Sequence, residues 1–281
     1  MKLGSFSIDG KPTYGIATDA GVIDLGRRLG DRHPDLKSLL AADAVAAAKA
    51  FVNEKIDAPF ERVTFRPVIP NPDKILCIGL NYEEHRLETA REKTDFPTVF
   101  LRQPESQIGH KQPLLCPRES TKLDYEGEIV LVIGKGGRRI SEADAWGHIA
   151  GYSIYNEGSV RDFQRHTTQF TAGKNFVGTG AFGPWMATAD EFAPGHVFSL
   201  ETRLNGNVMQ SATTEMLIFD FPTLIAYCST FLPLAPGDVI VTGTPGGVGS
   251  RRTPPVWMKP GDLAEIEVSG IGVLSNRVEQ D

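Results

Sequence analysis

One segment decides the fold of this 281-residue chain: Asp124-Tyr125-Glu126-Gly127-Glu128-Ile129-Val130-Leu131-Val132-Ile133. Its second half is a continuous apolar run, which is typical of a strand buried on both faces. Its first half carries acids at alternate positions, and alternate side chains of a strand point to the same face. Like charges on one face repel each other unless a cation or a basic group lies between them. Our first hypothesis is therefore an oxygen-rich site for Mg²⁺, Mn²⁺ or Ca²⁺.

The alternative is the solvated face of an amphipathic strand, which is the commoner origin of alternating acids. The buried run that follows argues against it, because such a face would continue to alternate. A second acidic segment supports the site hypothesis. The strand predicted over Tyr152–Tyr155 presents Glu157 just past its end. The two acidic clusters are therefore connected by segments predicted to be buried.

The composition is that of a globular protein, with 41% hydrophobic residues and a net charge of −6. We predict two domains, a small one over residues 1–70 and a larger one over residues 71–281, with the boundary in the proline-rich segment Pro67–Pro72. No basic stripe indicates nucleic-acid binding. No apolar run approaches the roughly 18 residues of a membrane span, and Met1–Ser5 has no signal-peptide core, so we expect a cytoplasmic protein. The three cysteines indicate neither disulfides nor a zinc site.

Local patterns predict further elements. Strand-like pieces broken by turns are expected at Lys2–Ile8, Thr13–Thr18, Gly21–Asp24 and Ile75–Gly79, helices at Leu36–Val52 and Asp220–Phe231, and a loop at Thr171–Phe176. The glycine-rich segment 241–249 fits neither of the phosphate-binding motifs, but its backbone N–H groups can hold a carboxylate or an oxyanion.

Two pairs of polar residues and one lysine have a chemical interpretation. His85 and Glu88 would share one face of a helix and hydrogen-bond, which orients an imidazole as a general base, although an exposed surface pair is commoner at this spacing. Arg161 and Gln164 have the same spacing. Lys174 is either an anchor for an anionic substrate or, more commonly, a solvated loop lysine.

Six blocks of sequence in a fixed order resemble the fumarylacetoacetate hydrolase family from about Lys74 to the C-terminus. They are Cys-Ile-Gly-Leu-Asn-Tyr-x-x-His, Asp-Tyr-Glu-Gly-Glu, Asn-Glu-Gly-Ser-Val-Arg-Asp-Phe-Gln, Gly-Lys-Asn-Phe, Pro-Gly-Asp-Val-Ile and Thr-Gly-Thr-Pro-x-Gly-Val-Gly. The resemblance implies an α+β fold, with a mixed β-roll catalytic domain behind a small N-terminal α/β domain, bound Mg²⁺ or Mn²⁺, and a homodimer.

The resemblance also implies roles for individual residues. It places the metal on Glu126, Glu128 and Glu157. It makes His85 and Glu88 the water-activating pair, and it assigns substrate binding and charge stabilisation to Arg161, Gln164, Lys174 and Thr244. Arg102 and His110 fall in the variable rim, where we expect them to select the substrate. The family usually has Asp where this chain has Glu157, and the longer side chain slightly favours Mn²⁺ over Mg²⁺.

The activity implied first is hydrolysis of a carbon–carbon bond in a 2,4-dioxo acid of the acylpyruvate type. His85 would activate water, Lys174 and Gln164 would stabilise the oxyanion, and pyruvate enolate would leave with its charge on the metal. The same chemistry serves an oxaloacetate-type decarboxylase or a keto–enol isomerase of aromatic catabolism. A non-catalytic carboxylate-binding protein is the remaining alternative, since Glu157 departs from the family pattern.

Overall fold

Strand β11, Gly127–Ile133, lies in the interior of a mixed sheet of twelve strands. The computed structural model describes residues 1–281. The order along the large sheet is β4-β3-β2-β1-β14-β12-β11-β17-β6-β7, with β5 paired to β1 and β8 to β14. A second sheet has five strands in the order β16-β15-β18-β19-β9, and β10 pairs with β13 alone. The predicted α+β fold with a mixed β-roll is therefore confirmed.

The strands have the following bounds: β1 Lys2–Ile8, β2 Lys11–Ala17, β3 Gly21–Asp24, β4 Ala58–Pro59, β5 Val63–Phe65, β6 Ile75–Gly79, β7 Thr98–Arg102, β8 Gln107–Ile108, β9 Leu114–Cys116, β10 Leu123–Asp124, β11 Gly127–Ile133, β12 Ile149–Glu157, β13 Ser159–Val160, β14 Gly180–Thr188, β15 Ser199–Leu204, β16 Asn207–Thr213, β17 Val239–Val241, β18 Leu263–Val268 and β19 Gly272–Gln280. The helices are α1 Leu25–Leu29, α2 Leu36–Ala41, α3 Val45–Lys49, α4 Glu83–Glu88, α5 Arg161–Gln164, α6 Thr171–Lys174 and α7 Phe221–Phe231. None of them is long and apolar enough to cross a membrane.

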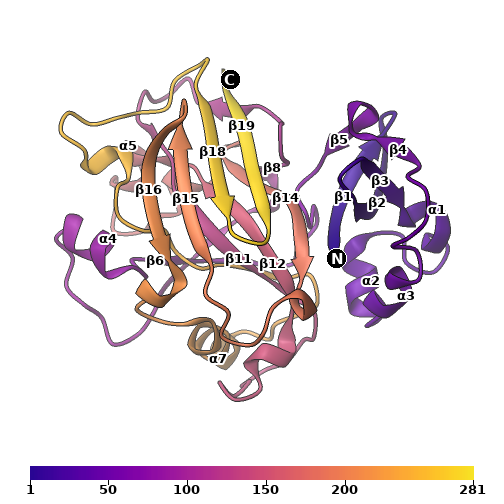
Figure 1. Ribbon diagram of the computed structural model, residues 1–281. Coiled ribbons are helices and arrows are strands. Elements are labelled where there is room, and N and C mark those ends of the chain that lie inside the picture. Colours follow the sequence, from indigo (N-terminus) through magenta and orange to yellow (C-terminus); the bar gives the residue numbers. More distant parts are fainter.

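The apolar run of β11 is buried on both faces, as its sequence predicts. Ile129, Leu131 and Ile133 pack in a core that also holds side chains of β15 and β18, so they face the second sheet. Val130 and Val132 point the other way, into a core shared with β1 and α2. Figure 1 shows the layer formed by β18 and β19 in front of β11 and β12.

The N-terminal strands continue the large sheet. Strand β1 pairs with β14 at Lys2↔Ala187 and Leu3↔Met186, while the rest of β1–β5 lies to one side of the larger body (Figure 1). The segment 66–74 connects β5 to β6 and contains the predicted boundary. The division into domains at residue 70 stays a prediction, because hydrogen bonding between strands crosses it.

Two local predictions are wrong. The single helix predicted over Leu36–Val52 is two helices, because Asp43 adopts the left-handed conformation, with φ 51°, after the end of α2. The N–H of Ala44 then bonds to the carbonyl of Leu39, which is the usual way to close a helix end. The loop predicted over Thr171–Phe176 contains the helical turn α6.

Candidate active site and metal centre

Three glutamates come together where β11 begins and β12 ends. Glu126 and Glu128 flank Gly127, and the N–H of Glu157 donates to the carbonyl of Glu126 at 2.8 Å. Gly127 has no room for a side chain, since a Cβ there would lie 2.1 Å from Oγ1 of Thr202 on the second sheet. One oxygen from each carboxylate lies within 4.8 Å of the others, and all three residues are buried. The side chain of Glu157 therefore reaches the cluster despite its extra methylene.

Asp124 does not share this cluster, contrary to the expectation of a continuous acidic face. The strand is interrupted between β10 and β11. Oδ2 of Asp124 accepts from Nε of Arg161 at 2.7 Å, and the N–H groups of Gly249 and Ser250 donate to the same carboxylate at 2.8 and 3.0 Å. The carboxylate thus positions Arg161 and the glycine-rich loop.

Two buried cations partly compensate the glutamates. Nη2 of Arg161 lies 2.5 Å from Glu126, and Nζ of Lys174 lies 2.5 Å from Glu126 and 2.7 Å from Glu157. Burial alone would raise the pKa of Glu126, but the charges of Arg161 and Lys174 lower it below its ordinary value. Burial alone would lower the pKa of Lys174, but Glu126 and Glu157 raise it. Lys174 is consequently a buried cation and not a solvated loop lysine.

The compensation leaves negative charge for a bound cation. Burial, together with the charges of Glu157 and Glu126, raises the pKa of Glu128 well above its ordinary value. Oε1 of Glu157 is buried and has no hydrogen-bond partner. Because carboxylate oxygens are the ligands of hard divalent cations, the three glutamates fit a divalent metal ion. Their arrangement does not distinguish Mg²⁺ from Mn²⁺.

His85 and Glu88 form the hydrogen-bonded pair that their spacing predicts. Nδ1 of His85 lies 2.7 Å from Oε1 of Glu88 on α4, and the N–H of Gly247 donates to Oε2 of Glu88 at 3.0 Å. His85 is buried and lines the same pocket as the three glutamates. The pair is therefore not exposed on a surface helix. With Nδ1 occupied by Glu88, Nε2 is the ring nitrogen left for a ligand.

The glycine-rich loop holds carboxylates, but they belong to the protein itself. The N–H groups of Gly243, Gly247 and Gly249 donate to Glu128, Glu88 and Asp124. Gly247 has a φ of 95°, and a Cβ there would lie 2.2 Å from the carbonyl oxygen of Met209. The loop joins metal cluster, histidine pair and Arg161 into one unit.

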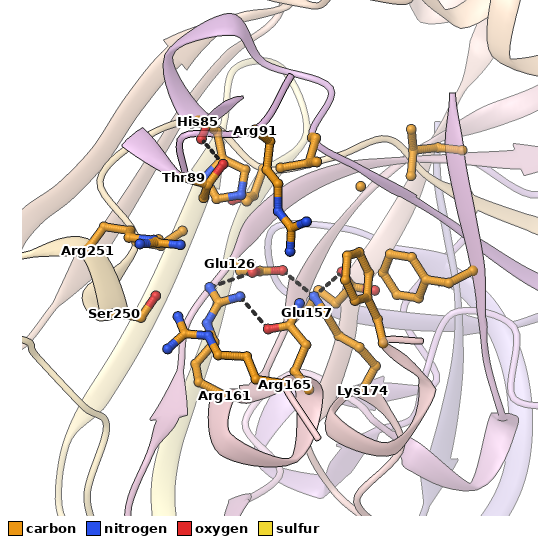
Figure 2. Close-up of a pocket in the computed structure, with 18 of the residues that line it drawn as sticks. His85, Thr89, Arg91, Glu126, Glu157, Arg161, Arg165, Lys174, Ser250 and Arg251 are labelled. Carbon is orange, nitrogen blue, oxygen red and sulfur yellow. Dashed lines mark hydrogen bonds and ion pairs between the residues drawn. The ribbon is translucent and has the colours of Figure 1, made fainter. Parts of the chain in front are cut away.

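The four residues predicted to bind substrate and stabilise charge also line the pocket. Arg161 donates from Nη1 to Oε1 of Gln164 at 2.9 Å across the single turn of α5. Gly173 packs closely against Gln164, which places Lys174 of α6 at the inner end of the pocket. The hydroxyl of Thr244 donates to the carbonyl of Gly127 at 3.0 Å. Figure 2 shows Arg161 and Lys174 on either side of Glu126.

The expectation that Arg102 and His110 form the pocket rim is wrong. Arg102 is buried beneath the site, where its guanidinium donates to the carbonyl of Gly158 at 3.1 Å and to Oγ1 of Thr179 at 2.8 Å. The ring of His110 packs edge-on against Phe65, and its Nδ1 accepts from the N–H of Ser275. Neither residue lines the pocket.

The actual rim contains Arg91, Arg165 and Arg251, which the sequence did not single out. They lie in three segments far apart in the chain, so no spacing connects them. The pocket has a volume of about 260 Å³, which is below the range of roughly 300–1,000 Å³ for drug-sized ligands. Its size and its charges suit a small anion.

Comparison with known proteins supports the resemblance in the motifs. Residues 74–279 match the family model for the C-terminal part of fumarylacetoacetate (FAA) hydrolase. The mitochondrial oxaloacetate tautomerase fahd2 of Xenopus laevis is 40% identical over 212 residues, which are 75% of this chain and 66% of that protein. Oxaloacetate tautomerase YisK of Bacillus subtilis (strain 168) is 41% identical over 214 residues, 75% of this chain and 71% of that protein. The chain thus spans about two thirds of the length of these relatives.

A solved structure matches over the whole chain. It is described as a "probable 2-hydroxyhepta-2,4-diene-1,7-dioate isomerase" from Mycobacterium abscessus, and it superposes with a TM-score of 0.82 at 30% identity, covering 100% of this chain and 99% of that chain. These similarities support an enzyme, while the expected hydrolase class is not confirmed by them. This chain belongs to the fumarylacetoacetate hydrolase family.

Proposed function

We propose that this protein catalyses the metal-dependent keto–enol tautomerisation of a small 2-oxo acid of the oxaloacetate type. The observation that carries the proposal is that His85, with Nδ1 held by Glu88, lines the same pocket as three buried metal-ligand glutamates. The names of the tautomerase relatives and of the isomerase with a similar structure support this alternative better than carbon–carbon hydrolysis.

The metal ion would be held by Glu126, Glu128 and Glu157. Mg²⁺ or Mn²⁺ bound there supplies a Lewis acid for the carboxylate and adjacent oxygen of a 2-oxo acid, which lowers the cost of enolate charge. Nζ of Lys174 adds a second positive charge at this end of the pocket, because its bonds to two glutamates keep it protonated. Arg161 is fixed by Asp124 and Glu126, and it orients Gln164 toward the ligand space.

His85 is the group that moves the proton at carbon 3. A neutral ring with its proton on Nδ1, shared with Glu88, keeps a lone pair on Nε2, which removes a proton from carbon 3 of the keto form. The double bond then shifts from the carbonyl to carbons 2 and 3, the oxygen takes a proton from water, and the protonated ring gives its proton to the hydroxide that remains. In the opposite direction the ring first takes a proton from water, the hydroxide that remains takes the proton of the enol oxygen, and the ring gives its proton to carbon 3. No atom is lost in either direction.

Hydrolysis of an acylpyruvate is the second candidate, and the same histidine pair favours it. A base oriented by Glu88 can equally remove a proton from water. Oxaloacetate decarboxylation needs the metal cluster but no such base. We also propose that the protein is a cytoplasmic homodimer whose partner is an oxo-acid substrate, with no nucleic-acid or membrane partner. The relative from Xenopus laevis is named as mitochondrial.

The test follows the ultraviolet absorbance of enol oxaloacetate after chelator treatment, with and without added Mg²⁺ or Mn²⁺, and measures pyruvate in the same samples. We expect metal-dependent loss of the enol without pyruvate. His85→Ala should lower turnover by on the order of 10²–10⁴ and leave metal affinity unchanged. His196→Ala, at an exposed position outside the pocket, is the control.

Other outcomes identify the rival functions. Pyruvate that forms in step with enol loss would indicate decarboxylation. Cleavage of a small acylpyruvate, with no effect on oxaloacetate, would indicate the hydrolase. A protein that binds neither Mg²⁺ nor Mn²⁺ would indicate a non-catalytic relative.

A further inference from the structure

Three arginines converge on the pocket from separate parts of the chain. Arg91 follows α4, Arg165 follows α5, and Arg251 belongs to a short turn, Gly249–Arg251, after the glycine-rich loop. All three line the pocket, and all three are exposed, so they lie at its mouth. Figure 2 shows Arg91 pointing toward Glu126 from one side, with Arg165 and Arg251 on another side.

None of these guanidinium groups has an acidic partner. Some exposed arginines elsewhere are paired, as in Arg27 with Asp57 and Arg62 with Asp9, but no salt bridge involves the three at the mouth. Burial and the charges of Arg251, Arg161 and Arg91 lower the pKa of Arg165 below its ordinary value. The mouth therefore carries a local excess of positive charge in a chain of net charge −6, and such a concentration of charge attracts anions.

The inner end of the pocket has different chemistry. There Arg161 is already bound to Asp124, Glu126 and Gln164, and Lys174 is bound to two glutamates. The inner end therefore accommodates one carboxylate with its neighbouring oxygen, through the metal ion of the proposed function. The free guanidinium groups at the mouth match the flat, two-oxygen geometry of a second carboxylate.

We propose that Arg91, Arg165 and Arg251 form an anion subsite at the pocket mouth that receives the distal carboxylate of a 2-oxo diacid. This inference rests on the proposed function, which places the 2-oxo end of the ligand at the glutamates. It narrows the substrate class, because a 2-oxo monoacid of equal length leaves the three arginines unpaired. It also means that residues outside the family motifs select the substrate in this protein.

The test compares two ligands of equal length on the Mn²⁺-loaded protein, 2-oxoglutarate and 2-oxopentanoate, which differ only in the distal carboxylate. Affinities are measured by titration calorimetry. One exposed ion pair contributes a factor of roughly 1.5 to 5 in affinity, so three together should make the diacid bind about tenfold more tightly. The preference should weaken as salt is added, because exposed charges are screened.

The triple variant Arg91→Gln, Arg165→Gln, Arg251→Gln should lose the preference and keep its affinity for 2-oxopentanoate. The matched control is Arg138→Gln, since Arg138 is also exposed, has no acidic partner and does not line the pocket. Equal affinity for the two ligands in the wild type, or an unchanged preference in the triple variant, would overturn the subsite.

The two proposals can fail separately. If the protein shows the arginine-dependent preference but does not tautomerise enol oxaloacetate, the subsite is supported and the proposed function is wrong. A tautomerase whose preference is unaffected by the triple substitution retains the function and loses the subsite.

Discussion

Nζ of Lys174 lies 2.7 Å from Oε2 of Glu157, so a cation of the protein itself lies among the carboxylates expected to bind the metal. Lys174 and a divalent ion then share the same negative charge. Replacing Lys174 by Met removes one positive charge, and we expect the metal to bind at least about tenfold more tightly by the Coulombic effect alone. Turnover should fall, because the ammonium group no longer stabilises the enolate.

The same substitution should weaken the metal-free protein. Removing one partner of a buried ion pair costs about 3–5 kcal/mol, because Glu126 and Glu157 stay buried with less compensation. Thermal unfolding should therefore show a lower Tm for Lys174→Met without metal and a larger increase on adding Mn²⁺. Lys135→Met, at an exposed position, is the control. Weaker metal binding by Lys174→Met would contradict the shared-charge interpretation.

Metal affinity should rise with pH, because Glu128 must lose a proton to become a ligand. Its pKa in the folded protein is raised above the ordinary 4.5 by burial and by Glu157 and Glu126. Between these two values the metal-free protein holds a proton that the metal displaces, so affinity should increase about tenfold per pH unit in that window. Calorimetry in buffers of different ionisation enthalpy measures the released proton.

The folding stability of the metal-free protein changes with pH in the opposite direction to metal affinity. A carboxyl with a raised pKa stabilises the folded state fully below pH 4.5, and this contribution is lost as the pH rises through the folded-state pKa. Glu128→Gln should abolish the proton release, and its metal-free form should gain stability over the wild type at higher pH. Glu61→Gln, at an exposed position, should change neither quantity. Proton release that persists in Glu128→Gln would assign the titration to another group.

The sequence predicted the parts of the site that lie on regular elements. The apolar run Ile129–Ile133 predicts a strand buried on both faces, and the strand predicted over Tyr152–Tyr155 presents Glu157 at its end. The spacing of His85 and Glu88 predicts their bond once the helix forms. These inferences depend only on local periodicity, which the packing did not override.

The remaining features depend on contacts between distant segments. Asp124 leaves the acidic face because the strand breaks and because Gly249, 125 residues later, supplies a backbone donor. The family resemblance placed Arg102 at the rim, yet its guanidinium is buried and donates to the carbonyl of Gly158 and the hydroxyl of Thr179, 56 and 77 residues later. The arginines at the pocket mouth have no common motif. Sequence patterns within one segment carry no signal for such features.

Gly247→Ala should reduce turnover far more than metal binding. The new Cβ would lie 2.2 Å from the carbonyl oxygen of Met209, so the loop must shift and its N–H must leave Glu88. Gly261→Ala is a matched control, because Gly261 has a φ of 96° and open space around the Cβ position. Both variants should lose about 1–2 kcal/mol from left-handed backbone strain, and only Gly247→Ala should lower kcat. Similar kcat values for the two variants would show that the loop does not position the pair.

Glu88→Gln tests whether the pair sets the tautomer of His85. A glutamine can present its NH₂ group to Nδ1, which moves the ring proton to Nε2 and removes the lone pair that faces the ligand space. The wrong tautomer lowers turnover by on the order of 10²–10⁴ in comparable histidine–carboxylate pairs. Metal affinity should not change, since Glu88 is outside the glutamate cluster, and Glu84→Gln on the same helix is the control. The measurements are kcat and the nitrogen chemical shifts of the His85 ring, which report the tautomer. A slow variant whose ring tautomer is unchanged would show that Glu88 only orients the ring.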